Sequence, residues 1–357
     1  MKKMIENVIP FPVGCETSRF FGAASSMHMA VLQETENLKH EFIFHVLYAV
    51  SGAGLFRLHQ SSVPHTIKGY DANEMNNFIL DYIPYSINYL GYGFKKLSAG
   101  EKSKEIIWSE ITASIDKNIP VLLKVSGTIQ WNVICGYGEN TTLYGLDAKD
   151  HYDKIAYTST VKPEGYVDNG YFYDSKWYES LEYVLICTPE DKSITFKTAL
   201  LRMCFFIENH LSNGFNANTL LLKNCDGFFA DKSDEYLKNL YSYIDSILGY
   251  LMEASHHVSE AFGAVWKRFI DNPAVNPQLQ DLFSKLDGTI TKTQGTVWEH
   301  WNYKPEGLEK YTLLKNQEFR NTLLAYLYRI AEDDKNALEL IRQAIDLIDD
   351  DYIDTSV

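Results

Sequence analysis

The hydrophobic periodicity of the chain changes near residue 190, and this change constrains the fold more than any other feature of the sequence. Before it, short apolar runs typical of β-strands alternate with helical segments. From Ser193 onward, apolar residues recur every three to four positions and no strand pattern is evident. The chain has 357 residues, a length typical of two domains. We therefore predict an α+β domain over residues 1–190 and an all-α helical domain over residues 191–357.

Strand-like runs follow one another closely in the later part of the first half. Each run is apolar and is bounded by Gly, Asn, Ser or Pro. The linkers between three of these runs are short turn sequences, which favours an antiparallel meander. The expected strands lie at 120–125, 130–137, 142–147 and 183–187.

Helical segments accompany these strands. The first, over about 18–33, is rich in Gly, Ala and Ser, and such small residues allow another element to pack closely against it. A second is expected over 41–49, and a third over 105–117, where three Ile residues recur at i, i+4 and i+8. In the second half, helices are expected at 194–211, 234–270, 278–294, 311–331 and 335–348.

Charge and cysteine content narrow the classes of partner and compartment. The chain carries 33 Lys and Arg against 47 Asp and Glu, and the resulting net charge of -14 argues against a nucleic acid as partner. The 5 cysteines form no CxxC pair, which predicts reduced thiols in a cytoplasmic protein. No apolar run approaches the length of a membrane-spanning helix, so we expect no membrane association.

Standard cofactor and metal signatures are absent from the sequence. It contains no GxGxxG, GxxxxGK[ST], HExxH or GxSxG motif. Asp147, Asp150, His151 and Asp153 fall close together in one expected loop, but their spacing matches no known metal-binding loop. We therefore expect neither a metal nor an organic cofactor.

The order of elements in the first half is that of a papain-like cysteine enzyme. In that layout the nucleophile lies at the start of a helix, where the helix dipole favours a thiolate. The general base is a His on a strand across the cleft, and an Asp or Asn on the next strand orients it. A helix followed by the run 130–137 and then the run 142–147 offers these three places.

Four short segments resemble the family of butirosin biosynthesis protein H, and the helical second half is similar to that family's C-terminal region. The resemblance implies a papain-like, C39-peptidase-like N-terminal domain followed by a helical domain. The type member transfers an acyl group from a carrier-protein thioester to an amine in antibiotic biosynthesis, which implies a small-molecule or peptide substrate and a carrier protein as partner. The segments are Glu41–Phe44, Ser51–Phe56, Ile134–Tyr137 and Leu143–Asp147.

The nucleophile of the family has no direct counterpart here. Counting back from the Glu41 segment, the family's Cys is expected between Ala23 and Ser26, where this chain has only Ala and Ser. Cys15 also precedes the first helix and is a candidate nucleophile, with a plain buried or loop thiol as the alternative. Ser25 and Ser26 are the other candidates, although a closely packed helix explains them equally well.

The general base of the family is also replaced. Its His is expected just before the Ile134 segment, where Trp131 and Asn132 stand, and neither is a general base at neutral pH. His28 on the first helix is a candidate substitute, with a structural histidine as the alternative. Asp147 keeps the third position of the triad.

Three functions are consistent with these residues. In the first, an acyltransferase-like or amidohydrolase-like protein of specialised metabolism uses Cys15 or a serine to attack a thioester or amide. In the second, a catalytically inactive pseudoenzyme binds a peptide, carrier protein or small molecule. In the third, a structural protein dimerises through the helical domain, and an exposed apolar helix face would support it. The expected substrate-binding residues are Gln130, Trp131, Asn132 and Tyr137.

Overall fold

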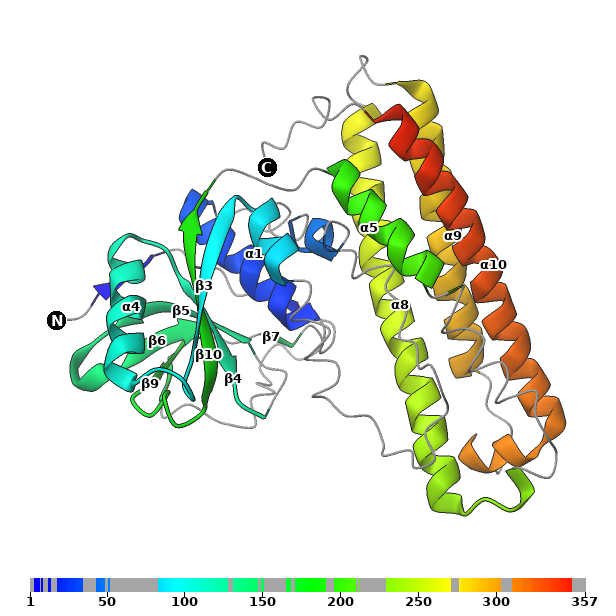
Figure 1. Cartoon of the computed structure of the whole chain (residues 1–357), viewed down its shortest axis with the longest axis horizontal. Helices are drawn as coiled ribbons and strands as arrows, with labels where there is room; N and C mark the ends of the chain where they lie inside the picture. Colours follow the sequence, from blue (N-terminus) through cyan, green and yellow to red (C-terminus); the bar gives the residue numbers. More distant parts are fainter. Residues whose placement is uncertain are drawn as a thin grey trace. The chain divides into compact units, whose positions relative to one another are not determined.

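The chain divides into two compact units (Figure 1). The first comprises residues 1–47 and 72–195, and the second comprises residues 48–71 and 196–357. All strands among the described residues belong to the first unit. The computed structural model describes residues 3–6, 8, 12–13, 18–34, 43–48, 51, 83–127, 131–146, 149–150, 165–167, 171–190, 196–209, 211, 229–270, 276–302 and 310–348.

An eight-stranded sheet forms the centre of the first unit, and all of its pairings are antiparallel. The strand order is β3-β10-β4-β5-β6-β9-β8, and β1 pairs with β5. This confirms the expected α+β class and the antiparallel sheet. The strands are β1 (Lys3–Met4), β3 (Tyr92–Ser98), β4 (Val121–Val125), β5 (Trp131–Tyr137), β6 (Leu143–Leu146), β8 (Gly165–Val167), β9 (Tyr171–Asp174) and β10 (Leu181–Pro189).

The strands β4, β5 and β6 form the meander that the turn sequences predict. Gly127 follows β4 with a φ of +67°, a left-handed conformation that glycine adopts without steric cost. All five residues of β4 are buried, as expected of a strand that is covered on both faces. The strand β10 pairs with both β3 and β4, so the last strand along the chain lies inside the sheet.

Helices α1 (Ser18–Leu32) and α4 (Lys104–Asp116) lie on either side of this sheet in Figure 1. Residues 20–30 of α1 are all buried. The Gly, Ala and Ser residues that are expected to allow close packing lie in the middle of this stretch. In α4 the predicted apolar face is confirmed, because Ile107, Ile111 and Ile115 are all buried. A separate parallel pair joins β2 (Pro12–Val13) to β7 (Lys149–Asp150).

The second unit is built from long helices, which are α5 (Phe196–Asn209), α8 (Asp234–Ile270), α9 (Pro277–Asn302) and α10 (Gln317–Leu347), together with the 3-10 helix η5 (Lys310–Lys315). Helix α9 packs against α8 and α10, and α5 packs against α10. The separate helices expected at 311–331 and 335–348 are wrong, since α10 runs through both. Its first turn is capped by Asn316, whose side-chain oxygen accepts a hydrogen bond from the amide of Phe319 at 3.1 Å.

In the part of the chain that the structure describes, no helix combines the length and the apolar character needed to cross a bilayer.

Candidate functional site

The start of β5 lies against the first turns of α1 in the first unit. Trp131 opens β5 and has no solvent-exposed surface. Its ring centroid lies 5.0 Å from that of Phe20 on α1 and 5.6 Å from that of Tyr183 on β10. The position at which the family resemblance expects an imidazole therefore holds an indole packed among aromatic rings.

The indole nitrogen of Trp131 is buried as well. None of the described residues accepts a hydrogen bond from its Nε1 atom. An indole N–H donates hydrogen bonds but cannot accept a proton. Trp131 therefore shapes the start of β5 by its volume and gives this position no general base.

The other expected substrate-binding residues do not gather around Trp131. Asn132 is buried and pairs with Leu123 in the sheet register, so its side chain points to the opposite face of β5 from Trp131. Tyr137 lies six residues further along the strand, about 20 Å from Trp131 at 3.3 Å per residue. Its hydroxyl donates a 2.8 Å hydrogen bond to Asp116 Oδ1 at the end of α4. Gln130 lies outside the described residues.

The candidate serines lie in the interior of α1 and not at its first turn. Ser25 and Ser26 are both wholly buried, about 10 Å along the axis from Ser18 at 1.5 Å per residue. The N-terminal end of a helix dipole stabilises an anion only within the first turn. The described geometry thus gives neither hydroxyl the activation that the papain-like layout requires.

His28 lies on the same helix, one turn beyond the serines. It is buried, and its Nδ1 atom lies 3.0 Å from the hydroxyl oxygen of Tyr92 on β3. The two rings meet edge to face with centroids 5.6 Å apart. Burial, followed by the nearby Cys187, raises the pKa of Tyr92 above its usual range, so this hydroxyl keeps its proton into the alkaline range. His28 is thereby engaged with Tyr92, about 12 Å along α1 from Phe20.

The described cysteines of the first unit are poor nucleophiles. Cys135 on β5 and Cys187 on β10 are buried, and burial raises the pKa of each thiol to about 12. The nucleophilic form of cysteine is the thiolate, which is negligible at neutral pH for such a pKa. Cys15 and Asp147 lie outside the described residues, and both flank the parallel pair of β2 and β7 in sequence.

Lys124 is a neighbour of Trp131 that sequence reasoning did not single out. It pairs with Trp131 on one side and Tyr183 on the other, and its side chain is 2% exposed. Its Nζ atom donates to the backbone oxygen of Val125 at 3.1 Å and lies 3.5 Å from Glu182 Oε2. Burial lowers the pKa of Lys124, while the Glu182 carboxylate opposes that shift. The signal in the sequence is a single charge within the apolar run Val121–Val125.

The described residues contain no group of three or more His, Cys, Asp or Glu side chains arranged to hold a metal ion. No known family model matches the chain, and no curated protein or solved structure shows significant similarity to it.

Proposed function

We propose that the first unit is a papain-like domain, resembling the butirosin biosynthesis protein H family, that binds an acyl or peptide ligand of specialised metabolism without histidine-dependent catalysis. Support for the papain-like assignment comes from α1, which packs on an antiparallel sheet with the start of β5 against its first turns. Papain-like enzymes hold a thiol and an imidazole at these two places. The ligand is a small molecule, a peptide, or an acyl group on a carrier protein.

The burial of Trp131 between Phe20 and Tyr183 carries the part of the proposal that excludes histidine-dependent catalysis. A general base must lie within hydrogen-bond reach of the proton that it abstracts. The indole cannot serve, and His28 is held by Tyr92 further along α1. A ligand can still bind in such a domain, because binding requires shape and polar partners but no proton transfer.

A synthetic acyl thioester of N-acetylcysteamine tests this proposal on the full-length chain. We expect the thioester to shift the thermal unfolding midpoint through reversible binding, with no covalent acyl adduct by intact-mass spectrometry. We also expect thiol release at the rate of the protein-free control. An adduct that maps to Cys15, is lost in Cys15→Ala, and accompanies catalytic thiol release would refute the proposal.

Acyl transfer by Cys15 is a second candidate, and the parallel pairing of β2 with β7 favours it. Val13 pairs with Asp150, and both strands run in the same direction. Cys15 follows Val13 by two residues, and His151 follows Asp150 by one. The described strands that precede Cys15 and His151 in the sequence are therefore neighbours in the fold.

In this second candidate the thiolate of Cys15 attacks the acyl carbon of a thioester. The carrier thiolate leaves and takes up the proton that the imidazole removed from Cys15, and an amine or water then accepts the acyl group. The experiment above separates the two candidates. Adduct formation that falls in both Cys15→Ala and His151→Ala supports acyl transfer, whereas reversible binding without an adduct supports the non-catalytic domain.

A further inference from the structure

Helix α5 of the second unit presents a stripe of exposed side chains that includes two large apolar residues. Thr198, Leu201, Phe205 and Glu208 follow one another at spacings of three, four and three residues, so they lie on one face of the helix. Leu201 is 52% exposed and Phe205 is 65% exposed. The opposite face is buried and consists of Ala199, Leu200, Met203, Cys204 and Ile207. We call the four exposed residues the α5 stripe.

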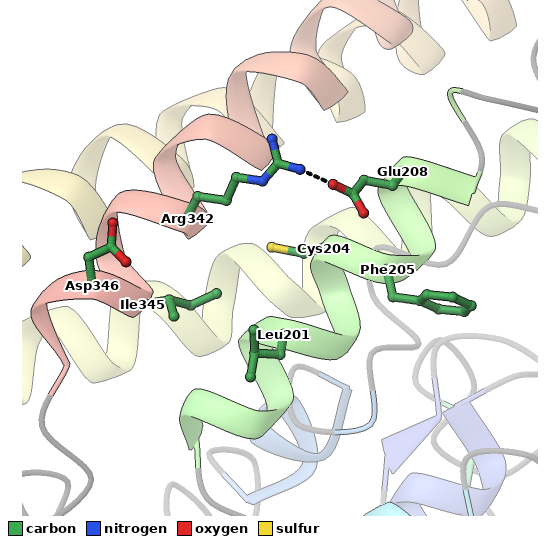
Figure 2. Close-up of a pocket in the computed structure, with 7 residues that line it drawn as sticks. All are labelled: Leu201, Cys204, Phe205, Glu208, Arg342, Ile345 and Asp346. Atoms are coloured by element: carbon green, nitrogen blue, oxygen red, sulfur yellow. Dashed lines mark hydrogen bonds and ion pairs between the residues drawn. The ribbon is translucent and has the colours of Figure 1, made fainter.

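A hollow of about 440 Å³ lies beside the α5 stripe, between α5 and α10. Figure 2 shows the Phe205 ring projecting away from Arg342, while Cys204 points toward α10. An ion pair between Glu208 and Arg342 closes one end of the hollow, and Ile345 adds apolar surface on α10. The orientation of the α5 stripe is therefore fixed relative to α10. Helix α5 packs against α10, and Glu208 on α5 forms an ion pair with Arg342 on α10.

The charges on α5 are arranged so that the stripe is complementary to itself. Lys197 lies one residue before the stripe, and Glu208 ends it. In an antiparallel pair with Leu201 opposite Phe205 of the partner, Thr198 lies opposite the partner's Glu208. Lys197 then lies one helical position, about 1.5 Å along the helix axis, from the residue that faces the partner's Glu208. A two-fold axis repeats each contact, which is the condition for a closed symmetric dimer.

We infer that the α5 stripe is the surface through which two copies of this chain associate, with their α5 helices antiparallel. Each Phe205 then covers Leu201 of the other copy, and each Lys197 adds a second cation beside the partner's Glu208, which also pairs with Arg342 of its own chain. These two contacts set the direction. Parallel packing would instead bring the two Lys197 ammonium groups together, which is unfavourable. Four exposed side chains on one helix are far fewer than the roughly 20–30 residues a side of a standard interface. The association is therefore reversible and concentration-dependent.

Sedimentation velocity over a concentration series measures this association in the full chain. We expect a reversible monomer–dimer equilibrium that Phe205→Glu weakens at least about 30-fold, because the change places a charge at the apolar centre. Trp298→Glu is the matched control, since Trp298 on α9 is 48% exposed but lies off the α5 stripe, and it leaves the equilibrium unchanged. A chain that stays monomeric at every concentration, or a dimer unaffected by Phe205→Glu, would overturn the inference.

Disulfide trapping tests the antiparallel register and leaves Leu201 and Phe205 intact. We expect Thr198→Cys with Glu208→Cys to give a covalent dimer under mild oxidation, beyond the background of the unsubstituted chain. Thr198→Cys alone gives none, because its two copies lie about 15 Å apart along the axis in this register. Efficient cross-linking by Thr198→Cys alone contradicts the antiparallel arrangement.

Discussion

The hydroxyl oxygen of Tyr92 lies 3.0 Å from Nδ1 of His28 and joins the edge strand β3 to the buried helix α1. Both side chains are buried. The pairing accounts for His28 as a structural residue of the first unit, which is one of the two roles that the sequence leaves open.

Replacing Tyr92 by Phe tests this structural role. Removing the hydroxyl takes away the hydrogen bond between Tyr92 and the buried Nδ1 atom of His28, so we expect the free energy of unfolding to fall by about 1–3 kcal/mol. Urea unfolding followed by circular dichroism measures the change. Ligand binding should persist in the folded variant. Unchanged stability in a folded Tyr92→Phe variant would show that this hydroxyl does not hold His28 in the fold.

The buried thiols of Cys135 and Cys187 predict a loss of stability at alkaline pH. Burial raises the pKa of each to about 12, above that of an exposed thiol. Between the two values the unfolded chain has lost the proton that the folded chain keeps, so the free energy of unfolding falls as pH rises. Each thiol contributes a slope of up to about 1.4 kcal/mol per pH unit.

Urea unfolding of the wild-type chain and of Cys135→Ala at pH 8 and pH 10 checks this slope. The variant should be less stable at both pH values, because a side chain is lost from the core, but its stability should fall less between them. An equal decrease in both proteins would show that the folded thiol ionises as readily as an exposed one.

The sequence predicts those elements whose side chains contrast strongly between two faces. Helix α4 is such a case. Its residues Ile107, Ile111 and Ile115 form a buried apolar face, whereas Lys104 and Glu105 in its first turn are charged. The strand β3 escaped prediction because it is an edge strand, where Lys95 and Lys96 interrupt the apolar pattern. The continuity of α10 was missed because Glu332, Asp333 and Asp334 look like a linker, yet neither Gly nor Pro interrupts the helix there.

The candidate site was harder to predict than the fold, since it depends on pairings between distant strands. The position of β10 beside β4 brings Tyr183 to Trp131, 52 residues away along the chain, and no local pattern encodes that contact. The same pairing surrounds Lys124 with aromatic rings. The resemblance to the butirosin biosynthesis protein H family marked Trp131 as a departure from the expected histidine, but no pattern in the sequence indicated its burial.

Lys124 offers a test of how the buried charge contributes to the sheet. Its partner Glu182 is 41% exposed and returns to water readily. We therefore expect Lys124→Met to leave the free energy of unfolding unchanged or to raise it by about 1–4 kcal/mol, as in other buried ion pairs. Lys124→Ala removes the aliphatic stem as well and should lower it by about 2 kcal/mol or more. Equal losses in both variants would show that the ammonium group itself stabilises the fold.

Introducing a base at Trp131 tests the proposed papain-like layout. Trp131→His supplies an imidazole at the family's position, and Trp131→Phe is the matched control for lost volume. We expect the histidine variant to acquire an acyl adduct at Cys15 at least about tenfold faster than the phenylalanine variant, since general bases contribute about 10²–10⁴-fold. Equal rates in two folded variants would argue that β5 does not face the nucleophile.

Intact-mass analysis of the wild-type chain after incubation with an acyl thioester tests the central proposal most directly. Because the indole of Trp131 is buried and cannot act as a base, we expect reversible binding and an unchanged protein mass. A mass increase by one acyl group, mapped to Cys15 and turned over with release of thiol, would contradict it.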